Sequence, residues 1–265
     1  MYKGELIHEQ EGRIDVAIKR IKLLSEETEE GKKTRKYLNS ERDVLSTLDK
    51  HDHIVRMYDA FEKEEYFYLV FEFCERGEFI ADQGCPEGLA RQILYQVILA
   101  LKYCRVKGIA HRDIKPGNIL MTAAGCVKLA DFGVARPVNF TSEEICTIGI
   151  GTHGYTSPES DDGDYSKGDE YAIGCLLFKL LTGRLPFGDP VKNMRAFLKN
   201  QDSEKYNFND VDCSEMCKDF ISKLIKRDVG ERMAFDEMLS HEFVSGFKVE
   251  YLECQCSLTK VEVKV

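Results

Sequence analysis

The sequence contains no apolar run long enough to cross a membrane. A membrane-spanning helix needs roughly 20 apolar residues, and the longest run here, residues 173–178, stops at Lys179. Residues 1–30 contain no uninterrupted apolar stretch between a basic start and small residues, so we expect no secretory signal. Both absences favour a protein of the cytoplasm or the nucleus that does not bind membranes.

Basic residues are also scarce. Lys and Arg number 37 against 46 for Asp and Glu, which gives a formal net charge of −9 at pH 7. An acidic chain is a poor electrostatic match for a polyphosphate backbone. We therefore expect no nucleic acid among its partners.

Cysteine and histidine do not cluster at zinc-binding spacing. Ten cysteines occur, but the close pairs Cys213 with Cys217 and Cys254 with Cys256 have no further Cys or His partner nearby. Cysteines in a chain without a secretory signal are expected to be reduced. The sequence therefore predicts free thiols and no metal held by cysteine.

Internal repeats and low-complexity linkers are absent as well, and 265 residues suffice for one large domain or two lobes. The first third favours strands, because apolar and polar residues alternate over 13–22. Two further strand patterns cover residues 54–61 and 66–73, with a charged turn at 62–65 between them.

Helical patterns follow and interrupt these strands. Residues 25–36 are dense in charge and indicate a loop that leads into a helix near Tyr37. From Pro86 onward the apolar residues recur with a helical period. A β-rich segment with one helix followed by a mainly helical segment predicts an α+β fold.

The segment most informative about chemistry is residues 111–118, which read HRDIKPGN. Thirteen residues after Asn118 come residues 131–133, DFG, and far upstream residues 16–19 read VAIK. Residues 157–159 read SPE. In this order the motifs resemble those of the eukaryotic protein kinases, in their serine/threonine branch.

The resemblance covers nearly the whole chain and implies a bilobal fold. It places a small β-rich lobe with one helix over residues 1–73, a hinge over 74–77, a larger and mainly helical lobe over 78–248, and a tail over 249–265. It also predicts an ion pair between Glu159 and Arg232. Leu45, Met57, His111 and Phe132 would stack inside the core.

Residue chemistry supports phosphoryl transfer, in which the protein mainly positions groups and neutralises charge. Lys19 on a rigid strand can hold phosphate oxygens, and Glu41 on the helix would hold that lysine. Asp131 and Asn118 offer the oxygen ligands that Mg²⁺ prefers.

The other site residues rest on the resemblance. Asp113 would orient the acceptor hydroxyl, and Lys115 would steady the transferred phosphoryl group. The adenine of ATP would bond to the backbone near Glu72 and Cys74. The residues expected around it are Phe71 as gatekeeper, with Ala17 and Leu120 on the two faces of the ring.

The main departure from the family lies at the start. Kinases carry a glycine-rich phosphate loop two short strands before the lysine, whereas residues 2–6 here already resemble the strand that follows that loop, and Gly4 and Gly12 have the wrong spacing. Two interpretations remain open: upstream residues are missing from this sequence, or the small lobe is abbreviated.

Substrate preference and control can also be read from the resemblance. Lys115 is typical of the Ser/Thr-directed branch. Glu78 would either bind a substrate arginine or be an ordinary helix-start acid. Arg112 beside Asp113 suggests control by phosphorylation of the segment that follows DFG. The candidate phosphorylation sites in that segment are Thr147, then Thr141 and Ser142. Cys146 in the same segment would be either a redox-sensitive thiol or a plain exposed thiol. Thr152 is expected to form hydrogen bonds with Asp113 and Lys115.

The sequence therefore predicts a serine/threonine protein kinase that uses ATP and Mg²⁺ and acts on protein substrates. The alternative is a pseudokinase, a binding or scaffolding module with the same fold and no turnover. Loss of Lys19, Asp113, Asn118 or Asp131 would mark a pseudokinase, and none of them is lost. Only the missing phosphate loop favours that alternative.

Overall fold

The structure is a computed structural model that describes residues 1–8, 12–48, 50–138, 151–162, 164, 166–209 and 211–245. Several positions singled out above lie outside the described residues: Thr141, Ser142, Cys146, Thr147, Cys254, Cys256 and the tail over 249–265.

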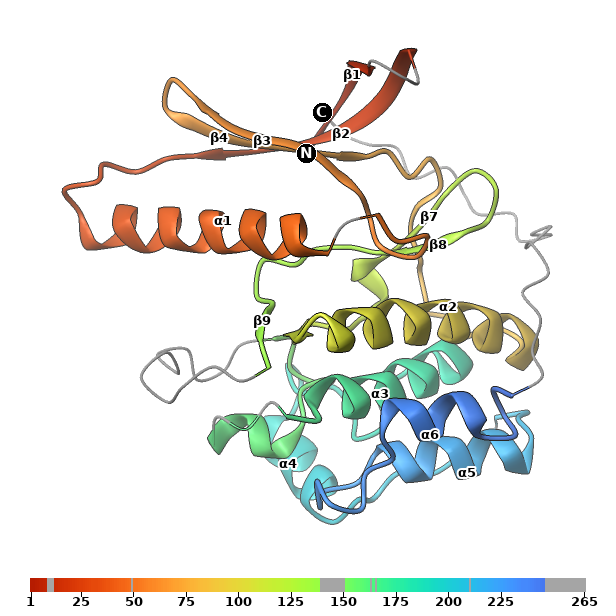
Figure 1. Ribbon diagram of the computed structural model, residues 1–265. Helices are drawn as coiled ribbons and strands as arrows, with labels where there is room; N and C mark the ends of the chain where they lie inside the picture. The colour runs from red at the N-terminus through yellow and green to blue at the C-terminus, as the bar shows by residue number, and fades with distance from the viewer. Residues whose placement is uncertain are drawn as a thin grey trace.

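An antiparallel sheet of four strands and one long helix make up the first lobe (Figure 1). The strands are β1 (Tyr2–His8), β2 (Gly12–Lys22), β3 (Met57–Lys63) and β4 (Tyr66–Glu72), in the spatial order β1-β2-β4-β3. Helix α1 (Glu29–Thr47) runs along one face of this sheet. Leu38 of α1 packs with Phe67 and Leu69 of β4, all of them buried, and this small core fixes the helix against the sheet.

Helix α1 begins earlier than the sequence suggested. The charged stretch over residues 25–36 was expected to be mainly loop, yet the helix starts at Glu29. Thr28 caps it, since its hydroxyl accepts a hydrogen bond from the backbone N–H of Gly31, and acidic Glu29 and Glu30 lie in the first turn, where the helix dipole favours negative charge. Capping and dipole thus outweigh the charge density that indicated a loop.

The strand expected over residues 54–61 is also shifted. Strand β3 begins at Met57, whereas Ile54 forms an isolated parallel bridge with Leu129, and the Val55 N–H donates to the Leu129 carbonyl at 2.9 Å. Ile54 and Val55 are both buried. Their apolar side chains thus serve the junction between the lobes rather than the sheet.

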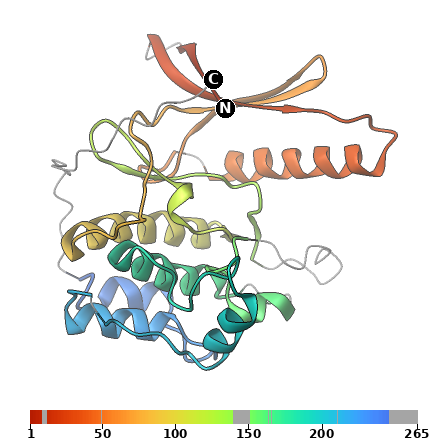
Figure 2. The same ribbon diagram turned by 180° about the vertical axis from the view of Figure 1, so that it is seen from behind.

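The second lobe is mainly helical, and both views show its helices stacked on the side of α1 away from the sheet (Figures 1 and 2). The helices are α2 (Glu87–Val106), α3 (Gly168–Thr182), α4 (Met194–Asp202), α5 (Glu215–Leu224) and α6 (Phe235–Ser240). Helix α2 starts after Pro86, as expected. The two-lobed α+β fold predicted from the sequence is confirmed.

Short strands connect the two layers. Strands β5 (Gly77–Glu78), β7 (Ile119–Met121) and β8 (Val127–Leu129) form one small sheet, and β6 (Ile109–Ala110) pairs with β9 (Arg136–Pro137). A 3₁₀ turn (Pro116–Asn118) precedes β7, and another (Pro158–Asp162) precedes α3.

Helix α3 is buried on nearly all sides. Ile173, Leu176 and Leu177 are fully buried in the large core that also contains residues of α2 and α5. A helix that is apolar all round belongs in the centre of a protein or in a bilayer. In the part of the chain that the structure describes, no helix combines the length and apolarity needed to span a membrane.

Of the four residues predicted to stack inside the core, His111 and Phe132 are in direct ring contact. The His111 ring lies 4.7 Å from the Phe132 ring, edge to face. Leu45 and Phe132 belong to the same core, and Met57 packs against it. The seven cysteines among the described residues are free thiols, as expected.

The predicted ion pair between Glu159 and Arg232 is confirmed. Arg232 is fully buried and Glu159 nearly so, and Arg232 Nη2 donates to Glu159 Oε2 at 3.0 Å. The same guanidinium donates to the carbonyl oxygens of Lys167 and Lys226, at 2.8 and 2.7 Å. The pair therefore ties the turn before α3 to the segment between α5 and α6.

We predict that Arg232→Met destabilises the fold by about 3–5 kcal/mol, because it leaves a mostly buried carboxylate and two carbonyl groups without their partner. Urea unfolding monitored by circular dichroism measures the change. Arg227→Met, which removes an exposed ion pair with Asp202, is the control and should change stability little. Equal effects of the two substitutions would contradict the structural role of Arg232.

Candidate active site

The β7–β8 hairpin brings two potential metal ligands together. Ile119 pairs with Leu129 in the hairpin, and the N–H of Ala130 donates to the carbonyl of Asn118 at 2.9 Å. Asn118 ends the 3₁₀ turn just before β7, and Asp131 follows Ala130 after β8. Strand register therefore places these two residues, thirteen apart in sequence, at the same end of the hairpin.

The loop over residues 111–118, called the catalytic loop below, is fastened to α3. Asp169 Oδ2 accepts a hydrogen bond from the His111 N–H at 2.7 Å, and its Oδ1 accepts one from the Arg112 N–H at 2.8 Å. Asp169 was not among the site residues expected from the sequence. An acidic residue in the first turn of an otherwise apolar helix was the signal that its carboxylate has buried donors to satisfy.

His111 acts as a neutral spacer under this loop. It is fully buried, and burial lowers the pKa of its imidazole, so the ring is uncharged. Its Nδ1 accepts from the Asp113 N–H at 3.3 Å, and its Nε2 lies 3.1 Å from the Ala130 carbonyl, which assigns the proton to Nε2. His111 thereby links the catalytic loop to the residue that precedes Asp131.

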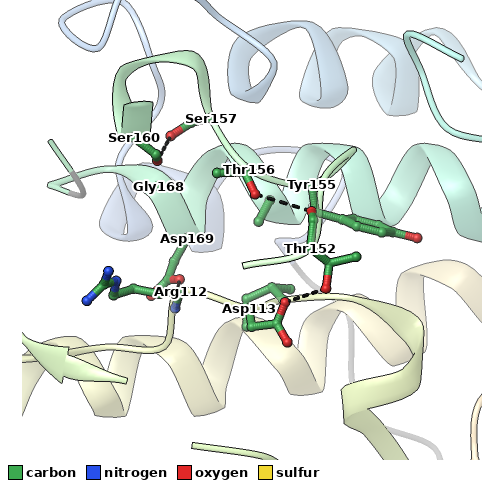
Figure 3. A pocket seen from close by; sticks show the side chains of 11 residues that line it. Arg112, Asp113, Thr152, Tyr155, Thr156, Ser157, Ser160, Gly168 and Asp169 are labelled. Atoms are coloured by element: carbon green, nitrogen blue, oxygen red, sulfur yellow. Dashed lines mark hydrogen bonds between the residues drawn. The ribbon is translucent and has the colours of Figure 1, made fainter. Parts of the chain in front are cut away.

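Asp113 lies in a dense hydrogen-bond network (Figure 3). The Thr152 hydroxyl donates to Asp113 Oδ1 at 2.7 Å, while Lys115 Nζ at 2.7 Å and Asn118 Nδ2 at 2.9 Å contact Oδ2. Lys115 also donates to the Thr152 hydroxyl at 2.7 Å, so Thr152 contacts both residues as predicted. Burial alone would raise the pKa of Asp113, but the bonds from Lys115 and Thr152 outweigh it and hold that pKa below its ordinary value.

Lys19 joins two carboxylates from distant parts of the chain. Its Nζ lies 2.9 Å from Glu41 Oε1 and 3.4 Å from Asp131 Oδ1. Glu41 is buried on α1, whereas the Asp131 side chain is half exposed. Burial disfavours the ammonium ion, but the two carboxylates outweigh it and raise the pKa of Lys19. The charged lysine thus connects the sheet, α1 and the segment after β8.

Two non-glycine residues of the site have left-handed backbones. Arg112 has φ of 71° and Asp131 has φ of 61°. Such conformations are unfavourable for side-chain-bearing residues and persist where the surroundings enforce them, as they often do at functional sites. Here the bond from the Arg112 N–H to Asp169 and the bond from the Ala130 N–H to the Asn118 carbonyl supply that constraint.

The donor set fits Mg²⁺. Asp131 contributes a half-exposed carboxylate, and Asn118 uses its Nδ2 for the Asp113 carbonyl and carboxylate, at 2.7 and 2.9 Å, so its amide oxygen points away from Asp113. Carboxylate and amide oxygens are hard ligands suited to this ion. Over the described ranges there is no group of three or more His, Cys, Asp and Glu side chains that could hold a metal.

The residues expected around adenine lie where the sheet meets the second lobe. Ala17 on β2 pairs with Phe71 on β4, and Leu120 on β7 pairs with Glu78 on β5. The Glu72 side chain forms an ion pair with Lys128 at 2.8 Å, and the Glu72 N–H donates to the Arg56 carbonyl. Of the polar groups of Glu72, the backbone carbonyl is therefore the one we consider for ligand binding.

Cys74 follows at the junction between the lobes. It is buried, and burial raises the pKa of its thiol to about 12. A thiol in that state is not a nucleophile at neutral pH. The backbone of Cys74, rather than its sulfur, is therefore the part suited to contact a ligand.

A pocket opens next to Asp113, between the catalytic loop, residues 152–160 and the first turn of α3 (Figure 3). Its lining includes Arg112, Thr152, Tyr155, Ser157 and Asp169. Ser157 and Ser160, both buried, share a hydrogen bond of 2.8 Å between their hydroxyls. The pocket is thus bordered by the same aspartate network that holds the catalytic loop.

Comparison with known proteins identifies a family with which this chain shares its sequence. Residues 5–244 match the family model described as "Protein kinase domain". The chain is 35% identical over 246 residues to an "Aurora kinase" of Encephalitozoon cuniculi, which covers 90% of this chain and 88% of that protein.

Two longer relatives are similar over one part of their length. "Probable serine/threonine-protein kinase KCC4" of Saccharomyces cerevisiae is 33% identical over 219 residues, 79% of this chain and 21% of that protein. "Serine/threonine-protein kinase PEPKR2" of Arabidopsis thaliana is 32% identical over 239 residues, 86% of this chain and 50% of that protein. The family match, these relatives and the site geometry agree: the chain belongs to the eukaryotic protein kinase family, among its serine/threonine kinases.

Proposed function

We propose that this chain transfers the γ-phosphoryl group of ATP to serine or threonine hydroxyls of protein substrates. The observation that carries the proposal is the contact of Lys19 with both Glu41 and Asp131, at 2.9 and 3.4 Å. A kinase needs its strand lysine paired with the helix glutamate and its DFG aspartate close by for turnover. The arrangement therefore supports an enzyme over the alternative of a fold kept only for binding.

The acceptor hydroxyl would bind at Asp113. Because its pKa is held low, this carboxylate is ionised at neutral pH and accepts hydrogen bonds. Its Oδ1 accepts one bond from Thr152 and, as a carboxylate oxygen, has room for a second from the substrate. The hydroxyl oxygen then attacks the γ-phosphorus, the bond to the β-phosphate bridging oxygen breaks, and the hydroxyl proton passes toward Asp113.

The remaining residues would hold the nucleotide. Lys19 would bind phosphate oxygens, Lys115 would contact the transferred group, and Mg²⁺ held by Asp131 and Asn118 would neutralise phosphate charge. The adenine would lie between Ala17 and Leu120. Its polar edge would bond to the backbone at Glu72 and Cys74, with Phe71 closing the pocket behind it.

Control by phosphorylation is the second part of the proposal. The guanidinium carbon of Arg136 on β9 lies 5.1 Å from the Tyr37 ring on α1. Burial raises the pKa of Tyr37, and the positive charges of Arg136 and then Arg112 oppose that rise. A phosphate bound by these groups would connect α1, which carries Glu41, to the catalytic loop.

We predict that Asp131→Asn abolishes Mg²⁺-dependent turnover while the fold remains, because the ligand charge is lost and the side-chain volume is kept. Loss of metal-based charge stabilisation implies a fall in kcat on the order of 10²-fold or more. Phosphoryl transfer at saturating ATP and Mg²⁺ measures it, with Asp15→Asn on β2 as the surface control. Unchanged turnover would contradict the metal assignment.

Lys19→Met is expected to lower kcat/KM by on the order of 10²-fold, since one preorganised cationic donor to the phosphates is removed. Steady-state kinetics with varied ATP measure the change. Lys22→Met is the matched control on the same strand, because Lys22 forms an exposed pair with Glu65. If both variants kept full activity, the phosphate-binding cation would have to be elsewhere.

Transfer of radiolabelled γ-phosphate to a basic protein and to the chain itself tests the function directly. We expect transfer by the 265-residue chain and none by Asp113→Asn, because an amide cannot accept the proton. Nucleotide binding without transfer by the folded chain would favour the pseudokinase. Transfer that persists in the variant would indicate another acceptor-orienting group.

A further inference from the structure

Glu170 is a buried acid that the mechanism above does not use. It lies in the first turn of α3, beside Asp169, and is only 2% exposed. Its Oε2 is buried and, within the described part of the chain, has no hydrogen-bond partner. An orphaned carboxylate oxygen is costly and is expected only where it has a function or a constraint.

The charged groups around Glu170 come from three parts of the structure. Arg105 on α2 places its Nη2 3.7 Å from Glu170 Oε1, too far for a hydrogen bond but close enough for an ion pair. Asp169 adds a negative charge from the same helix turn. Arg232 adds a positive charge from the segment between α5 and α6, where it is engaged with Glu159.

Arg105 connects Glu170 to the catalytic loop. Its Nη2 also donates to the Ser166 carbonyl just before α3, at 2.5 Å. Seven residues after Arg105, the backbone of Arg112 is held by Asp169. The segment over residues 105–112 is thus fastened to the start of α3 at both ends, at one end through Arg105 and at the other through Asp169.

Glu170 gains and loses its proton near neutral pH. Burial raises the pKa of Glu170 to about 7, the charge of Asp169 adds to this, and Arg105 and Arg232 oppose it. Ionised Glu170 attracts Arg105 strongly, and neutral Glu170 does not. The strength of the fastening at the Arg105 end therefore changes between about pH 6 and pH 8.

We propose that Glu170 is a positioning residue for phosphoryl transfer: its carboxylate acts through Arg105 to hold residues 105–112, and so Asp113, in the productive geometry. This inference rests on the proposed function. Ionisation of Glu170 strengthens the fastening and raises kcat, whereas protonation loosens it. The binding of ATP, which involves other residues, is unaffected.

The stability of the fold depends on pH in the opposite direction to kcat. Because the folded-state pKa of Glu170 lies above its ordinary 4.5, the folded protein binds the proton more tightly than the unfolded chain. The contribution of Glu170 to stability therefore falls as pH rises from about 4.5 to 7 and is constant above that. The ionised form that positions the loop is also the form that destabilises the fold.

The test is the pH dependence of kcat for the wild type and Glu170→Gln between pH 6 and 8. Gln resembles the protonated acid, so the ratio of wild-type kcat to variant kcat should rise from about 1 at pH 6 to ~3–5 at pH 8, with KM for ATP unchanged. Glu231→Gln, an exposed acid elsewhere in the second lobe, should give a constant ratio. A constant ratio for Glu170→Gln as well would overturn the proposal.

Two variants of Arg105 test the route. Removing the cation in Arg105→Gln should abolish the inflection of kcat between pH 6 and 8, because ionised Glu170 then has no cation through which to hold residues 105–112. Arg105→Lys keeps the charge and should leave the inflection near its wild-type position. An inflection that persists in Arg105→Gln, at the same or at a shifted pH, would overturn the route through Arg105.

Thermal unfolding gives a readout independent of activity. The Tm of Glu170→Gln should exceed that of the wild type by about 2–4 °C at pH 8, with a difference that shrinks toward pH 4.5. A difference independent of pH would show that Glu170 does not titrate and would overturn the proposal. No transfer by the wild type at any pH would overturn the proposed function, whereas transfer with a constant kcat ratio would overturn only the role of Glu170.

Discussion

The site depends on the first turn of α3, the most deeply buried of the helices that the structure describes. Its apolar sides hold it in the core of the second lobe, and its start is therefore a fixed point. Asp169 at that point holds the catalytic loop through two backbone N–H groups, at 2.7 and 2.8 Å. The buried pair of Arg232 and Glu159 keeps the preceding turn in place through the Lys167 carbonyl. The position of Asp113 thus depends on the burial of α3, a helix far from it in the sequence.

The first lobe holds the charged side chain of Lys19, which would contact the phosphates of the nucleotide in the proposed function. Lys19 lies on a strand whose neighbour β4 packs on α1, so the helix carboxylate of Glu41 reaches it at a defined distance. Glu41 is buried and Asp131 is half exposed, so the lysine has one partner inside the protein and one that is open to solvent. The position of α1 therefore controls the charge arrangement on which transfer would depend.

Backbone strain and the burial of charge oppose stability at several points in the second lobe. Two left-handed residues, Arg112 and Asp131, and two adjacent buried acids, Asp169 and Glu170, are all unfavourable by themselves. They occur together where the catalytic loop meets α3 and β8. Such conflicts between local preference and the overall fold are typical of functional sites, where the rest of the protein supplies the compensating stability.

The sequence by itself determined the fold class, the order of the elements and the residues expected to carry the chemistry, because motifs and local periodicity are properties of short segments. Lys19, Asp113, Asn118 and Asp131 were all identified in this way; the structure joins Lys19 to Asp131 and Asn118 to Asp113 through their side chains. Only the tertiary structure decided where α1 begins, that Ile54 and Val55 pack at the junction with β8, and that the Glu72 side chain is held by Lys128. It also decided that Asp169 and Glu170 are buried beside Arg105 and the catalytic loop. These outcomes depend on burial and hydrogen bonds between residues far apart in the chain, which no local pattern records.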